Sequence, residues 1–146
     1  MTTHVSVSSA EVGVQQAMEF VTDEKCGAAA TFVGVTRSDV VENKRVTALE
    51  FEAHVKLAES VMHQIIDEYR AKNPNLIHVF VHHRLGVVPA GEGNVVIAVS
   101  SGHRRAAFQA LENIMDQLKA KLPVWKKEIY DDGSYRWLEN AEFSNG

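Results

Sequence analysis

The junction around Pro123 constrains the fold of this chain more than any other feature, because a helical pattern changes there to a strand pattern. Apolar residues recur at helical spacing over residues 103–121, and this set comprises Ala107, Phe108, Leu111, Ile114, Met115 and Leu118. Proline cannot continue a helix, since it lacks an amide hydrogen and its ring clashes with the preceding turn. Residues 124–130 then read as a strand. The junction therefore predicts a long helix, a forced turn and a strand, with lysines on both sides of the turn.

The rest of the chain also alternates between strand and helix patterns. We expect strands over residues 4–8, 27–35, 46–53, 76–85, 94–100 and 135–138, and helices over about residues 10–21 and 55–72. Ser9 is the expected cap of the first helix, residues 38–45 read as a loop, and residues 89–94 as a tight connection. This order favours one α+β domain over residues 1–146, with helices packed on a mostly antiparallel sheet. The polar tail from about residue 140 is expected to fray.

Composition narrows the range of partners. The 146 residues carry a net charge of −4, so an anion site has to be a local basic cluster, and nothing supports a nucleic-acid module. The one cysteine, Cys26, cannot form an internal disulfide, which predicts a reducing, cytoplasmic setting. We expect no signal peptide and no membrane span, because no apolar run approaches the roughly 20 residues that a span needs.

Lys119 and Lys126 are the first candidates for chemistry. Lys119 follows Leu118 at the edge of the apolar stripe, and Lys126 follows Trp125 on the next strand. A helix–turn–strand unit could bring the two ammonium groups together, and lysine side chains against packed apolar surface can serve as acid, base or nucleophile. The alternative is that both extend into solvent, as most lysines do.

Two other positions indicate anion binding. His103, Arg104 and Arg105 follow Ser101-Gly102 at a helix start, where free amide hydrogens and the positive end of the helix dipole favour anions. Basic side chains oppose that dipole, which suggests a compensating phosphate; a solvated basic turn is the alternative. Thr36-Arg37 ends the strand over residues 27–35, a usual place for a binding residue, although a surface ion pair would also explain a single arginine.

The histidines do not predict a metal site. His82 and His83 are neighbours on a strand and point to opposite faces. His78 and His82 could share a face, but we find no carboxylate or cysteine that completes a zinc site with them. Cys26 is expected to be structural, because it lacks a nearby catalytic partner in the sequence.

The length of the helix before Pro123 predicts how its two ends are used. His103 and Lys119 lie roughly 24 Å apart along the helix axis, at about 1.5 Å per residue. They cannot both contact one small substrate within a single chain. If they serve one site, two chains share it, so we expect a homodimer in which His103 and Arg104 of one protomer face Lys119 and Lys126 of its partner.

Several segments resemble the large, catalytic subunit family of molybdopterin synthase. They are residues 27–37, which end in Val35-Thr36-Arg37; His83-Arg84 with Gly86, Gly91 and Glu92; Ser101-Gly102-His103-Arg104 with Ala107-Phe108; Asp116 and Leu118-Lys119 with Pro123, Trp125-Lys126-Lys127-Glu128; and Gly133 with Trp137. Each piece is weak alone, but the combination is specific and runs over about residues 26–139. The sequence departs from the family pattern at His54 and Leu57, where Tyr and Met are usual, and in its short tail without basic residues.

The resemblance implies an α/β hammerhead-like fold around a homodimer core and a role in molybdenum cofactor biosynthesis. The family moves sulfur from the C-terminal Gly-Gly thiocarboxylate of a small ubiquitin-like subunit to cyclic pyranopterin monophosphate, which forms the molybdopterin dithiolene within a heterotetramer. Carried onto this chain, it implies catalytic roles for Lys119 and Lys126 and substrate binding by Val35, Thr36, Arg37, His103, Arg104, Lys126, Lys127 and Glu128. It implies no metal and no cofactor. The alternative is a non-catalytic dimeric module that binds a phosphorylated metabolite or a ubiquitin-like tail.

Overall fold

The computed structural model describes residues 1–138, which form nine strands and three helices. The strands are β1 Thr2–Ser8, β2 Ala28–Val35, β3 Val40–Val41, β4 Lys44–Ala53, β5 Leu76–Arg84, β6 Gly86–Pro89, β7 Gly93–Ser101, β8 Val124–Tyr130 and β9 Tyr135–Leu138. The helices are α1 Val14–Val21, α2 Val55–Lys72 and α3 Arg104–Lys121. The tail that we expected to fray lies outside the described residues.

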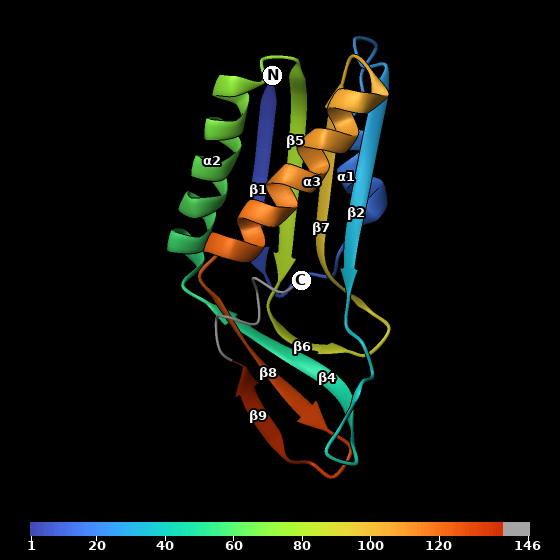
Figure 1. The fold of residues 1–146 in the computed structure, drawn as a ribbon, viewed down its shortest axis with the longest axis vertical. Helices are drawn as coiled ribbons and strands as arrows, with labels where there is room; N and C mark the ends of the chain where they lie inside the picture. The colour runs from blue at the N-terminus through green and yellow to red at the C-terminus, as the bar shows by residue number, and fades with distance from the viewer. Residues whose placement is uncertain (139–146) are drawn as a thin grey trace.

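The larger sheet has the strand order β1-β5-β7-β2, and different helices cover its two faces (Figure 1). α2 and α3 pack on one face, where the core includes Met62, Ile66, Ile97 and Ile114. α1 packs on the opposite face against Phe80, Val96 and Ala98. Ile97 lies between Val96 and Ala98 on β7 yet faces the other way, because successive side chains on a strand alternate between faces.

A second sheet lies beyond the end of the larger sheet at which β2 and β5 finish (Figure 1). It contains β3, β4, β8 and β9 in this order, and β6 also pairs with β4. Its buried residues Phe51, Val88 and Val124 pack with Leu85, which follows β5, and with Leu122, which follows α3. The turn at Pro123 therefore joins the end of α3 to the inner face of the smaller sheet.

The α+β class, with helices packed on antiparallel strands, is confirmed. Two sheets replace the single sheet that we expected, and β1 pairs with β5 in parallel. The prediction for the first helix was wrong at its start: α1 begins at Val14, with Gly13 at the cap position and no side-chain cap hydrogen bond. Val14 is exposed and Ser9 caps nothing, because residues 9–13 form the connection from β1 instead.

Part of the predicted loop over residues 38–45 is a hairpin. β3 pairs antiparallel with β4, and the two turn residues, Glu42 and Asn43, have φ values of 51° and 66°. Two consecutive positive φ values are typical of the type I′ turn, whose twist matches that of a two-residue hairpin. Glu-Asn is not the Asn-Gly or Asp-Gly pair usual in this turn, so the sequence carries little hairpin signal.

The two departures from the family pattern lie together at the start of α2. His54 occupies the cap position, and its Nδ1 accepts a hydrogen bond of 3.2 Å from the amide of Leu57. Both side chains are exposed. Within residues 1–138, no helix is long and apolar enough to cross a membrane.

Candidate active site

The helix α3 carries candidate residues at both of its ends. His103 is its N-cap residue and makes no side-chain cap hydrogen bond, and Arg104 begins the helix. Lys119 and Lys121 lie in the last turn, where positive charge is favourable next to the negative end of the helix dipole. The helix dipole therefore stabilises the positive charges in the last turn and destabilises those in the first turn.

Short backbone hydrogen bonds fix the junction at Pro123. The amide of Leu122 donates to the Leu118 carbonyl at 2.9 Å, and the amide of Val124 donates to the Leu122 carbonyl at the same distance. Leu118 and Val124 are both buried, so the turn is anchored on each side. Lys119 directly follows one anchor and Lys126 comes two residues after the other; both side chains are half-buried. The junction therefore holds both lysines on ordered backbone at one end of α3.

Lys126 lies on the inner face of the smaller sheet. It is paired across the strands with Phe51 of β4, and cross-strand partners point to the same face. Phe51 is only 4% exposed, and its ring meets the His83 ring edge-on at a centroid distance of 4.9 Å. Phe51 thus lies between the strand that carries Lys126 and the buried end of β5.

His83 is the residue in this region that sequence reasoning did not single out as functional. Its Nδ1–H donates to the Arg84 carbonyl at 2.9 Å. Burial lowers the pKa of His83 to about 4, with smaller lowering contributions from the charges of His82 and Lys126, while the hydrogen bond to Arg84 acts in the opposite direction. His83 is therefore neutral at pH 7, and it lies near enough to Lys126 for the lysine charge to lower its pKa. The signal in the sequence was its place in the His83-Arg84 motif.

Lys127 points to the opposite face from Lys126, because neighbours on a strand alternate. Its Nζ lies 3.6 Å from Oε2 of Glu50, 4.3 Å from the centroid of the Tyr135 ring and 5.4 Å from that of Trp137. A carboxylate and two aromatic rings thus hold this ammonium group on the outer face. The structure does not bring Lys127 together with Lys126.

Glu128 returns to the face of Lys126, two residues further along β8. Its Oε1 accepts hydrogen bonds from the Tyr130 hydroxyl at 2.8 Å and from Arg136 at 3.1 Å. The Glu128 carboxylate helps to raise the pKa of Tyr130, after burial as the largest cause. Glu128 therefore tethers β9 to β8 at the rim of the Lys126 face.

Val35, Thr36 and Arg37 lie where β2 ends, at the side of the larger sheet that faces the smaller one (Figure 1). Thr36 is buried: its amide donates to the Glu92 carbonyl at 3.1 Å and its carbonyl accepts from the Gly91 amide at 2.8 Å. Val35 is exposed, and the side chain of Arg37 is 81% exposed and paired with Asp39 at 3.1 Å. Thr36 fixes the backbone, and Arg37 projects from that fixed point into solvent.

His103 and Arg104 line an open hollow of about 780 Å³ at the start of α3, together with Gly27, Gly102, Arg105, Phe108 and Gln109. Its floor is tight: a Cβ on Gly27 would lie 1.9 Å from the Gly102 carbonyl oxygen, so only glycine fits there. The amide of Gly27 also donates to the Ser101 carbonyl at 3.0 Å. The hollow thus combines a close backbone contact with basic side chains and an exposed aromatic ring.

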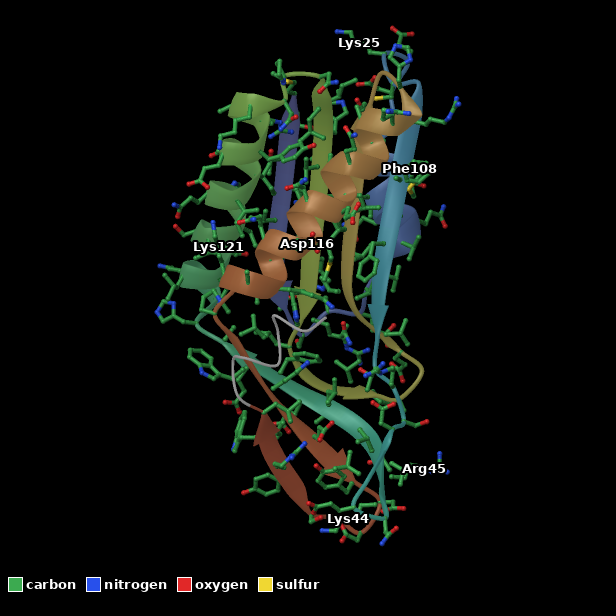
Figure 2. The ribbon with its side chains drawn as sticks, in the orientation of Figure 1. Lys25, Lys44, Arg45, Phe108, Asp116 and Lys121 are labelled. Carbon is green, nitrogen blue, oxygen red and sulfur yellow. The ribbon has the colours of Figure 1, made fainter. Side chains whose placement is uncertain are left out.

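Within one chain, the structure separates the predicted residues into two groups. Figure 2 shows Phe108 near the start of α3 and Lys121 near its other end, which points towards the smaller sheet. Arg104 and Lys119 are fifteen residues apart in this helix, which is roughly 22 Å along the axis. Arg37 belongs to the lysine end, because β2 starts at Ala28, next to Gly27 of the hollow, and runs towards the smaller sheet. A site shared between two chains stays a prediction.

Comparisons with known proteins now identify the family. A family model described as MoaE protein matches residues 7–121. The chain belongs to the MoaE family. A molybdopterin synthase catalytic subunit from Taeniopygia guttata is 44% identical to it over 138 residues, which cover 94% of this chain and 88% of that protein. Molybdopterin synthase catalytic subunit 1 from Aedes aegypti is 48% identical over 128 residues, which cover 86% and 82%. In a longer relative from Drosophila grimshawi, 40% identical, the matched region is only 38% of that protein.

Solved structures show the same MoaE fold. A molybdopterin synthase structure from Staphylococcus aureus superposes with a TM-score of 0.86 and 34% identity, and the match covers 92% of this chain and 96% of that one. A protein–protein complex of subunits 1 and 2 of molybdopterin-converting factor from Helicobacter pylori 26695 contains a chain with a TM-score of 0.70 and 18% identity, covering 94% and 90%. The second similarity concerns the fold alone.

Proposed function

We propose that this chain is the catalytic subunit of a molybdopterin synthase. In this reaction sulfur passes from the C-terminal thiocarboxylate of a small ubiquitin-like subunit to cyclic pyranopterin monophosphate, which yields the molybdopterin dithiolene. The observation that carries the proposal is the pair Lys119 and Lys126, held on the two sides of the anchored Pro123 turn in a chain of the MoaE family. The names of relatives at 44% and 48% identity support it.

The chemistry requires groups that move protons and steady negative charge. The thiocarboxylate sulfur attacks an electrophilic carbon of the pterin substrate and displaces an oxygen from it. Water then hydrolyses the acyl link between the tail and the new sulfur, which releases the tail as a carboxylate. A second thiocarboxylate delivers the second sulfur of the dithiolene in the same way. A lysine placed next to the reacting atoms can transfer protons, and a second ammonium group can stabilise the oxyanion that forms during hydrolysis. Lys119 and Lys126 supply both functions, with the neutral ring of His83 behind Lys126.

The substrate phosphate suits the hollow at the start of α3. His103 and Arg104 line it, and the unpaired amides of a helix start favour an anion. Because these residues lie roughly 22 Å from Lys119 along the helix, we infer that they serve the lysines of a partner protomer. Arg37 projects at the lysine end and would meet the same substrate.

The partner is inferred from the chemistry of sulfur delivery. A thiocarboxylate at a flexible chain end has to reach Lys119 and Lys126, which lie at the junction of the two sheets. A small ubiquitin-like subunit with a Gly-Gly end would supply it, and two such subunits around a homodimer of this chain would form a heterotetramer. The single cysteine agrees with assembly in a reducing, cytoplasmic setting.

A second candidate function rests on the hollow alone. A basic depression of about 780 Å³ with an exposed aromatic ring would also suit a non-catalytic dimeric module that binds a phosphorylated metabolite. Such a module would have no use for the lysines at the other end of α3. The two functions therefore differ in whether Lys119 matters.

Single-turnover conversion of cyclic pyranopterin monophosphate tests the proposal. The reaction uses this protein with a thiocarboxylated small subunit, and fluorescence of the oxidised product reports turnover. We expect product from the wild type and at least about a hundredfold slower conversion by Lys119→Ala, the usual scale for loss of an acid–base group. Lys121→Ala is the matched control, because Lys121 lies in the same last turn but is exposed. Equal rates for wild type and Lys119→Ala would favour the binding module.

A further inference from the structure

Three potential metal ligands from distant parts of the sequence converge at the end of the larger sheet opposite the smaller sheet. Asp23 and Cys26 lie in the turn between α1 and β2, and His78 lies on β5. One ligand atom from each residue lies within 4.8 Å of the other two. Figure 2 places Lys25, from the same turn, at that end of the molecule. This cluster is separate from the lysine junction.

Hydrogen bonds already hold all three of these residues in position. Oδ2 of Asp23 lies 2.6 Å from Nε2 of His78, and Oδ1 of Asp23 accepts from the amide of Lys25 at 2.7 Å. The Cys26 thiol donates to the same Oδ1 at 3.4 Å, and the Cys26 amide donates to the Asp23 carbonyl at 3.2 Å. The turn thus directs a carboxylate and a thiol towards one imidazole.

A second layer of contacts orients the imidazole. Nδ1 of His78 accepts a hydrogen bond of 3.2 Å from the Thr2 amide and lies 2.8 Å from the Thr2 hydroxyl. The ring therefore carries its proton on Nε2, which faces Asp23, and Arg70 holds Thr2 through a 2.6 Å hydrogen bond to the Thr2 carbonyl. Metal-ligating histidines usually donate a hydrogen bond from their second nitrogen. A metal at Nε2 would take the place of that proton, and Nδ1 would then carry the proton and donate to the Thr2 hydroxyl instead of accepting from the Thr2 amide.

We propose that Asp23, Cys26 and His78 form a binding site for Zn²⁺. A thiolate, an imidazole and a carboxylate are the three ligand types that zinc takes in proteins, and the two negative charges balance those of the ion. Zn–N and Zn–O bonds of about 2.0 Å in tetrahedral geometry separate the two ligand atoms by about 3.3 Å. Asp23 and His78 therefore have to move apart by less than about 1 Å from their present 2.6 Å.

A fourth ligand would come from the hollow beside Asp23 and His78. A hollow of about 430 Å³ is lined by Asp23, His78, Lys25 and Asn75 among others, and it can admit water or an external ligand. Gly102 lines both this hollow and the basic one at the start of α3. The zinc site would therefore tie the turn before β2 to β5, next to the floor of the proposed phosphate site.

Cobalt substitution and thiol chemistry test the site in the full-length, tag-free protein after removal of metals by a chelator. Because Cys26 is the only cysteine, any thiolate-to-cobalt charge-transfer band has to come from this residue. We expect that band with Co²⁺, its loss when Zn²⁺ displaces the cobalt, and at least tenfold slower reaction of the thiol with a disulfide reagent when Zn²⁺ is present. These measurements need only the wild type, so they do not depend on whether a variant folds.

Variants then assign the other ligands. Calorimetric titration with Zn²⁺ should show at least tenfold weaker binding for His78→Ala and Asp23→Asn, and no charge-transfer band for Cys26→Ser. His63→Ala is the control, since this histidine is exposed on α2 and absent from the cluster. Three outcomes would each overturn the proposal. They are cobalt binding without the charge-transfer band, a rate of thiol reaction that Zn²⁺ does not change, and a loss of Zn²⁺ affinity in His63→Ala equal to that in the ligand variants.

Discussion

The two ends of α3 place positive charge in opposite surroundings. At its start, Arg104 borders an open hollow beside Phe108, whose side chain is 63% exposed. At its end, Lys119 follows a buried leucine, and Lys126 shares a sheet face with Phe51, which is almost fully buried. An open hollow lined by basic side chains can attract an anion, whereas a turn anchored by buried residues holds its lysines in fixed positions. We therefore propose that the start of α3 recognises the substrate and that its end carries the reaction.

The largest expected effect is a difference in the rate of sulfur transfer between variants of Lys126 and of its neighbour Lys127. We expect Lys126→Ala to slow sulfur transfer by about 10² to 10⁴, the range for loss of a group that acts in acid–base catalysis. Lys127→Ala should change the rate at most a few-fold, because Lys127 is held on the outer face by Glu50 and Tyr135. Single-turnover rates measure both. A slower Lys127→Ala than Lys126→Ala would contradict the assignment of the two faces.

Stability should distinguish the packed end from the open one. Phe51→Ala should reduce the free energy of unfolding by about 3–5 kcal/mol, because it removes a buried ring that contacts His83. Phe108→Ala should change it by about 0.5 kcal/mol or less, since the ring is exposed. Urea denaturation of the two variants provides the measurement. Similar losses would show that the start of α3 is as tightly packed as its end.

Acid should weaken the packed end through His83. The pKa of this histidine is lowered to about 4 in the folded protein from an ordinary 6.5, so between these values the unfolded chain binds a proton that the folded chain does not. The contribution of neutral His83 to the free energy of unfolding is therefore complete above pH 6.5. It is lost as the pH falls to about 4, and the loss amounts to up to about 3 kcal/mol. Urea denaturation at several pH values across this range gives the free energy of unfolding, which should fall less steeply with decreasing pH for His83→Gln than for the wild type. An unchanged slope would place the acid sensitivity elsewhere.

Mixed dimers test whether the two ends meet across an interface. Lys119→Ala and Arg104→Ala should each be weakly active alone. If one protomer supplies Lys119 and its partner supplies Arg104, every mixed dimer has one intact site, so random exchange of equal amounts should restore about a quarter of wild-type activity. No recovery after verified exchange would show that Arg104 and Lys119 do not serve a shared site.

Local patterns predicted most of the elements but not how the sheets are divided. The Pro123 turn, α2 and α3 follow from residues near one another in sequence, and the predicted range of α2 matches Val55–Lys72. β6 and the hairpin of β3 with β4 were missed, because these short strands are defined by their pairing with β4 and their own composition does not indicate a strand. The start of α1 was misplaced since Ser9, a good capping residue, belongs to the preceding connection.

The candidate site residues also fall into two groups: some are recognisable from one segment of sequence, and others depend on contacts between distant segments. The lysines and the basic helix start could be proposed from the sequence, because motifs and helix length are properties of a single segment. His83 was not singled out, since its role depends on burial against Phe51, which lies thirty-two residues earlier on another strand. The Asp23–Cys26–His78 cluster was also missed: no carboxylate or cysteine lies near His78 in the sequence pattern that pairs it with His82, and in the structure His82 contacts Ser6 and the Ala10 carbonyl instead.

The sequence by itself determined the long helix that ends at Pro123, the order of the elements and the family to which the chain belongs, because these depend on periodicity, backbone restriction and the spacing of motif residues. Only the tertiary structure decided that Lys126 and Lys127 face opposite ways, that His83 is neutral, and that the ligand atoms of Cys26 and His78 lie within 4.8 Å of each other. Those properties arise from strand register, burial and contacts between residues far apart in the chain, and no local pattern specifies them.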